Sequence, residues 1–185
     1  MKKILWGGLV GAVVLFTWSF VSHMFLPLGH IGIQQVPNED PILDAMRANI
    51  QQPGLYFLPG LARSQYNDEA AMKGWTEKAG RGFAIVIYQL HGGGMMPQQL
   101  ITEFASNFLL ALLAALLLSH IGGGFLTRTL AVGIMGLIAG LDVYVSYWNW
   151  FKFPTDYTLA VMFDQLIGFL LMGAALAWIV KKSEA

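Results

Sequence analysis

Four long apolar stretches dominate this sequence, and they limit the possible folds more than any other feature. They cover approximately 4–26, 100–118, 125–147 and 157–180, and each contains few charged residues. A hydrocarbon layer of ~30 Å requires about 20 residues of helix, so each stretch is long enough to cross a bilayer. The composition, 56% apolar and 12% charged, also lies outside the usual balance of soluble proteins. The sequence therefore predicts an all-α membrane protein built on a bundle of four transmembrane helices.

The positions of lysine and arginine predict the orientation of these helices. Lys2 and Lys3 precede the first stretch, Arg128 begins the third, and Lys181 and Lys182 follow the fourth. Because positive residues near helix ends favour the cytoplasmic side, we expect both termini in the cytoplasm of a bacterial inner membrane. The first stretch lacks a small-x-small cleavage site, so we interpret it as a retained helix and not as a signal peptide.

The segment between the first two stretches, residues 27–99, is expected to form a small extracytoplasmic α+β cap. Asp40 followed by Pro41 is typical of a helix start, and a second helix is predicted from Asn67. Strands are predicted at 55–58 and 83–90, with a third at 31–36. A segment of ~70 residues without disulfides has little core of its own, so it should rest on the helix ends or on a partner. The predicted division is therefore 1–26, 27–99 and 100–185.

The absence of cysteine excludes several cofactors. No thiolate is available for a disulfide, an iron–sulfur cluster or the covalent attachment of haem c. The formal net charge is zero and no cluster of basic residues resembles a nucleic-acid footprint, so nucleic acid is not an expected partner. The expected partners are the bilayer and either another membrane protein or further copies of the chain.

Each apolar stretch carries its most polar residues near its outer end. With a helical rise of ~1.5 Å per residue, Glu103, Asp142 and Asp164 lie roughly 21–25 Å above the inner ends of their helices. We therefore predict one buried polar cluster in the outer third of the bundle. Its expected members are Ser19, Ser22, His23, Glu103, Asn107, Asp142, Asp164 and Gln165.

Spacing and small residues support an inward position for these groups. Ser19, Ser22 and His23 follow an i, i+3, i+4 pattern and share one helix face. Glycines one turn apart, such as Gly136 and Gly140, allow helices to approach closely. An unpaired carboxylate in hydrocarbon is costly, so such groups should meet each other, reach water or be protonated.

Three interpretations of the cluster remain open. It could be a structural network that fixes the positions of the helices relative to one another. It could bind protons or a metal ion, with His23, Glu103, Asp142 and Asp164 as candidate ligands. It could instead bind the polar head of a lipid or quinone, with help from aromatic residues of the outer turn. Those aromatic candidates are Tyr147, Trp148, Trp150 and Tyr157, which also fit an ordinary interfacial belt.

The predicted topology resembles that of the claudins, with four spans, both ends inside and a first outer segment that contains strands. The tryptophan and paired-cysteine signature of that family is missing, and GLYFLPG at 54–60 does not match it. The resemblance therefore concerns architecture alone and implies no function.

The leading functional hypothesis is an accessory, structural or binding subunit of a larger membrane assembly. It is motivated by the small size of the chain and by a cap too small to be self-sufficient. The alternatives are a small membrane enzyme or proton-coupled carrier that uses the polar cluster, and a lipid- or quinone-binding protein. No residue is assigned a catalytic role, and the sequence does not identify a cofactor.

Overall fold

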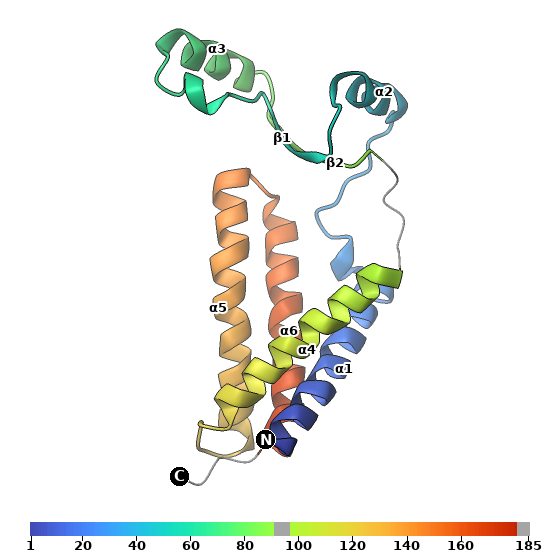
Figure 1. Ribbon diagram of the computed structural model, residues 1–185, viewed down its shortest axis with the longest axis vertical. Helices are drawn as coiled ribbons and strands as arrows, with labels where there is room; N and C mark the ends of the chain where they lie inside the picture. The colour runs from blue at the N-terminus through green and yellow to red at the C-terminus, as the bar shows by residue number, and fades with distance from the viewer. Residues whose placement is uncertain (91–96, 181–185) are drawn as a thin grey trace. The chain divides into compact units, whose positions relative to one another are not determined.

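The computed structural model describes residues 1–90 and 97–180, and these are mostly helical (Figure 1). His91 and the positive charges Lys181 and Lys182 lie outside the described residues. The chain divides into two compact units. We call residues 1–34 with 95–185 the helical unit, and residues 35–94 the cap unit.

The helical unit contains four helices that are long and apolar enough to cross a membrane, as the sequence predicted. Their ends follow local signals. Pro97 occupies the first turn of its helix, and Lys152 takes a left-handed conformation (φ 60°) that ends the third helix just before Pro154. The four helices are α1 (Lys2–Met24), α4 (Pro97–Leu118), α5 (Phe125–Phe151) and α6 (Thr155–Ile179).

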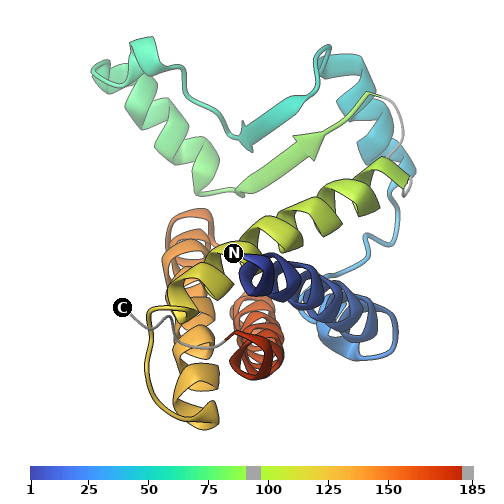
Figure 2. The same cartoon turned by 60° about the horizontal axis from the view of Figure 1, so that its bottom comes forward.

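The four helices do not pack equally against one another. Helix α5 lies along α6, and α1 packs against both α4 and α6. Helix α4 meets α5 and α6 much less, because it crosses the other helices at an angle (Figures 1 and 2). The helices therefore form the series α4, α1, α6, α5, in which the two outer members are neighbours over only a short length.

The apolar core occupies the half of the helical unit near the start of α1 and the end of α6. Helix α4 supplies Ala111, Ala115 and Leu118, and α6 supplies Met172 and Leu176, all fully buried. The residues of the predicted polar cluster lie nearer the opposite ends of their helices. Most of that cluster is therefore placed beyond the apolar core and not inside it.

Glycines set the closest approaches between helices. A Cβ atom on Gly11 of α1 would lie 2.7 Å from that of Ala111, and one on Gly136 of α5 would lie 2.4 Å from Cγ of Phe169. Both distances are too short for real atoms, so these positions accept only glycine at the present helix separation. The close approach of helices that the sequence predicted at glycines thus occurs at these two positions.

The cap unit contains two helices and a two-stranded antiparallel sheet. Asp68 caps α3 by accepting hydrogen bonds from Ala70 N (2.9 Å) and Ala71 N (3.1 Å). The sheet pairs Gly54 with Tyr88 at one end and Leu58 with Ala84 at the other. The elements are α2 (Asp40–Asn49), β1 (Gly54–Leu58), η2 (Arg63–Gln65), α3 (Glu69–Ala79) and β2 (Ala84–Tyr88).

The expected third strand at 31–36 is wrong. After α1 the chain forms a short 3₁₀ turn, η1 (Pro27–Gly29), and then turns again through Gly32. Gly32 has φ of +78° and lies against the backbone of Tyr157 at the start of α6, where a side chain would clash. A strand cannot form through such a turn, and residues 31–34 of this segment belong to the helical unit.

Candidate functional site

The polar residues at the end of α1 form a local hydrogen-bonded group. Ser22 is fully buried and its hydroxyl donates to the backbone oxygen of Ser19 at 3.2 Å. Nδ1 of His23 lies 2.9 Å from the same oxygen and 2.9 Å from Oγ of Ser22. Ser19 lies within α1, which ends at Met24, so these side chains add contacts to an oxygen that the helix backbone already uses. The group therefore reinforces the last two turns of α1.

The same arrangement occurs at the end of α4. The hydroxyl of Ser119 donates to the backbone oxygen of Leu116 at 2.7 Å, and Nδ1 of His120 lies 3.0 Å from that oxygen. Two helices of this chain thus end in a Ser-His pair with equivalent contacts. The repetition favours a structural role in helix termination for both pairs.

Three members of the predicted buried cluster are exposed. His23, Glu103 and Asp142 all have exposed side chains in the described chain. The helical rise per residue places these residues at similar heights along their helices. It does not fix the direction in which each side chain points. Because α4 and α5 are neighbours over only a short length, Glu103 and Asp142 do not turn toward a shared interior. In the single chain these three side chains are therefore exposed, and a shared buried cluster that includes them stays a prediction.

Asp164 and Gln165 on α6 do lie at helix contacts. The indole Nε1 of Trp18 donates to the backbone oxygen of Asp164 at 3.0 Å, which joins α1 to α6. Nε2 of Gln165 donates to the backbone oxygen of Gly136 at 3.1 Å, which joins α5 to α6. Oδ1 of the Asp164 side chain is buried and has no hydrogen-bond partner in the described chain.

Asn107 is the most buried amide of the predicted cluster. It is only 8% exposed on α4, and its Nδ2 is buried without a hydrogen-bond partner among the described residues. A buried donor without a partner costs about 1–3 kcal/mol, so this position is unfavourable for stability.

The candidate metal ligands are not brought together. Over residues 1–90 and 97–180 the structure contains no group of three or more histidine, aspartate, glutamate or cysteine side chains arranged to hold a metal ion. His23 already shares its Nδ1 with the α1 terminus, and Glu103 and Asp142 point outward.

The aromatic candidates of the outer turn pack mainly on one another. The rings of Tyr147 and Phe153 stack with centroids 5.4 Å apart, and the ring of Phe153 also contacts that of Tyr157 at 5.6 Å. Nε1 of Trp148 donates to the hydroxyl of Thr155 at 3.0 Å. These contacts close the turn between α5 and α6, and Trp150 remains 74% exposed.

Arg128 has a role that sequence reasoning missed. In the sequence, Arg128 is one of the positive residues that indicate the cytoplasmic side of the membrane. Its side chain is nevertheless only 5% exposed. Its Nη1 donates to the backbone oxygen of Ile121 at 2.6 Å, and its Nη2 donates to the backbone oxygen of Val180. A guanidinium is well placed at the negative end of a helix, here α6. No sequence signal distinguishes this buried arginine from an exposed one.

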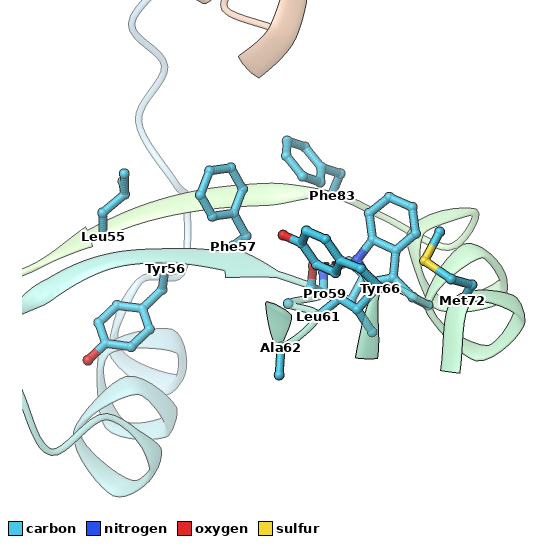
Figure 3. A pocket seen from close by; sticks show the side chains of 11 residues that line it. Leu55, Tyr56, Phe57, Pro59, Leu61, Ala62, Tyr66, Met72 and Phe83 are labelled. Atoms are coloured by element: carbon cyan, nitrogen blue, oxygen red, sulfur yellow. Dashed lines mark hydrogen bonds between the residues drawn. The ribbon is translucent and has the colours of Figure 1, made fainter. Parts of the chain in front are cut away.

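The cap unit contains an apolar groove that sequence reasoning also missed. Its volume is about 690 Å³, and none of the described residues that line it is charged. Figure 3 shows Phe57, Phe83 and Tyr66 near one end of the sheet, and Met72 beyond them on α3. Alternation along β1 could have indicated that Leu55 and Phe57 share one face, but it could not show that this face remains uncovered.

No family model, no curated protein and no solved structure matches this chain.

Proposed function

We propose that this protein is an integral membrane protein that serves as an accessory or binding subunit of a larger membrane assembly. In this proposal the four helices span a bacterial inner membrane, both termini lie in the cytoplasm, and the cap unit lies outside. The length and apolar character of the helices support insertion, and the positions of lysine and arginine support this orientation.

The observation that carries the proposal is the exposed position of Asp142. Helix α5 ends at Phe151, nine residues after Asp142, so this carboxylate lies about 14 Å below the helix end. An exposed carboxylate at that depth would face lipid hydrocarbon, where ionisable groups are costly and are almost always turned toward protein or water. A neighbouring chain with a basic or hydrogen-bond-donating side chain would remove that cost.

Further residues extend the polar surface of α5. Ser146 and Asn149 follow Asp142 at i+4 and i+7, so the three residues share one face, and all three are exposed. Glu103 is likewise exposed on α4. Polar faces on helices that are otherwise apolar fit a docking role, because a partner helix can supply the hydrogen bonds that lipid does not.

Native mass spectrometry of the full chain, extracted with its surrounding lipid, tests the proposal. We expect the wild-type protein in a complex heavier than one chain, and we expect Asp142→Arg to release the single chain. Asp142→Asn, which keeps hydrogen bonding, should retain at least part of the complex.

Val143→Asn is the matched control, because it alters an exposed neighbour about 100° around the same helix. This variant should assemble like the wild type. A wild-type protein that occurs only as a single chain would overturn the proposal, as would a complex that Asp142→Arg leaves intact.

A further inference from the structure

No residue from 35 to 90 in the cap unit is buried, and its sheet exposes apolar side chains. The strand register places Leu55 opposite Ile87 and Phe57 opposite Ile85, so these four side chains share one face of the sheet. Leu55 is 58% exposed and Ile87 is 75% exposed. A two-stranded sheet is only marginally stable by itself, and an uncovered apolar face makes it less so.

Beside this sheet, α3 and the turn η2 enclose the groove. Nε1 of Trp75 on α3 donates to the backbone oxygen of Pro59 at 3.0 Å, which holds the helix against the end of β1. The rings of Phe57 and Phe83 lie 6.2 Å apart on the sheet side. Met72 adds a flexible apolar side chain on the helix side. Tyr56 points to the opposite side of its strand from Leu55 and Phe57 (Figure 3).

The size and chemistry of the groove fit a small apolar ligand. Its volume of about 690 Å³ falls within the range of roughly 300–1,000 Å³ for small-molecule sites. The indole donor of Trp75 is already used internally, and the hydroxyl of Tyr56 donates to the backbone oxygen of Gln52 at 2.8 Å. No described lining residue is charged, so the groove presents a mainly apolar surface that suits a hydrocarbon chain, and Tyr66 adds one hydroxyl.

A short covalent linker joins the cap unit to a helix that is long and apolar enough to cross a bilayer. Strand β2 ends at Tyr88 and α4 begins at Pro97, so eight residues separate them. Nine Cα-to-Cα steps span at most about 30 Å when fully extended. If α4 crosses a bilayer, as proposed above, this linker tethers β2 to a membrane-inserted helix; this step rests on the proposed membrane insertion.

We propose that the groove between β1, η2 and α3 binds a lipid acyl chain. The bound group is a saturated or unsaturated hydrocarbon chain, which free fatty acids and phospholipids both contain. Binding would cover Leu55, Phe57 and Met72, which are otherwise in contact with water. The site is distinct from the aromatic outer turn between α5 and α6.

Photo-crosslinking of the full chain in phospholipid nanodiscs tests this site. One arm uses a 16-carbon fatty acid with a diazirine in mid-chain, and the other uses a phosphatidylcholine that carries the same labelled chain. We expect saturable labelling of residues 55–83, reduced at least five-fold by excess unlabelled fatty acid or phosphatidylcholine. The arm that labels more strongly identifies the source of the chain.

Met72→Glu places a charge in the groove and should reduce labelling of residues 55–83 at least five-fold. Ile87→Asp is the matched control, because Ile87 is an exposed apolar residue on the same sheet and does not line the groove. It should label like the wild type. Tyr66→Glu, at a 60% exposed position on the groove edge, provides a second charged variant should Met72→Glu unfold the cap unit.

Several outcomes would overturn the acyl-chain proposal. They are labelling of residues 55–83 that excess lipid does not reduce, crosslinks from this segment to another protein in place of lipid, and equal labelling in both groove variants and the wild type. The wild-type competition decides the question even if both variants misfold. Failure of membrane insertion would be seen separately, as protein that does not co-elute with nanodiscs.

Discussion

The guanidinium of Arg128 at the start of α5 donates a hydrogen bond to the backbone oxygen of Val180 at the end of α6. Its second donor reaches Ile121, in the turn that follows α4. One buried cation thus joins three segments at the end of the helical unit that contains the core residues Leu118 and Val180. This arrangement makes the α4–α5 turn part of the packed structure and not a free loop.

Replacement of Arg128 by methionine should destabilise the helical unit by about 2–4 kcal/mol, because two backbone oxygens lose a charged donor in a buried place. Arg128→Lys should have a smaller effect, since a single ammonium can still reach one of the two oxygens. Unfolding in detergent, followed by helical circular dichroism, measures both changes. Arg81→Met, at an exposed arginine of the cap unit, should change stability by less than about 0.5 kcal/mol. Equal stability of Arg128→Met and the wild type would contradict this assignment.

Two glycines on the same face of α5 should respond oppositely to alanine. A Cβ on Gly136 would lie 2.4 Å from Cγ of Phe169, whereas one on Gly140 would lie 3.7 Å from Cγ of Met162, an ordinary contact. Gly136→Ala should therefore destabilise the α5–α6 pair by about 1–3 kcal/mol. Gly140→Ala should be neutral or stabilising by up to about 1 kcal/mol, because alanine favours helix. The same unfolding measurement compares them, and a larger loss in Gly140→Ala would disprove the proposed helix contact.

The sequence predicted the helices well because each depends on local signals. The predicted apolar stretches begin and end within a few residues of the observed helix ends. The two short strands and both cap helices also occur close to their predicted positions. These features need little information about which elements become neighbours.

The polar residues were harder to place because their environment depends on helix pairing. The rise per residue gives the level of Asp142 along α5, but not which helix lies beside it. Helix α4 pairs with α1 and crosses away from α5, so the polar faces of α4 and α5 do not meet. The burial of Arg128 depends in the same way on where α6 ends, 52 residues further along the chain.

Asn107 offers a test of whether a buried polar side chain of α4 is merely tolerated. Its Nδ2 is buried without a partner in the described chain, so Asn107→Leu, which keeps the branching of the side chain, should leave stability unchanged or raise it by up to about 1 kcal/mol. Asn107→Asp should lower stability by about 2 kcal/mol or more, since it buries a carboxylate. A pronounced loss of stability in Asn107→Leu would show that the amide has a partner absent from a single chain.

The orientation of the helices can be tested with single cysteines, because the chain contains none. Lys78→Cys lies in α3 of the cap unit and Thr127→Cys lies in the first turn of α5, and both positions are exposed. A membrane-impermeant maleimide added to intact bacterial spheroplasts should label Lys78→Cys and leave Thr127→Cys unlabelled. After the membrane is permeabilised, both should react to a similar extent, which controls for thiol accessibility. The reverse pattern would place the cap unit in the cytoplasm and contradict the orientation derived from Lys2, Lys3 and Arg128. Labelling of both positions in intact spheroplasts would contradict a membrane crossing between them.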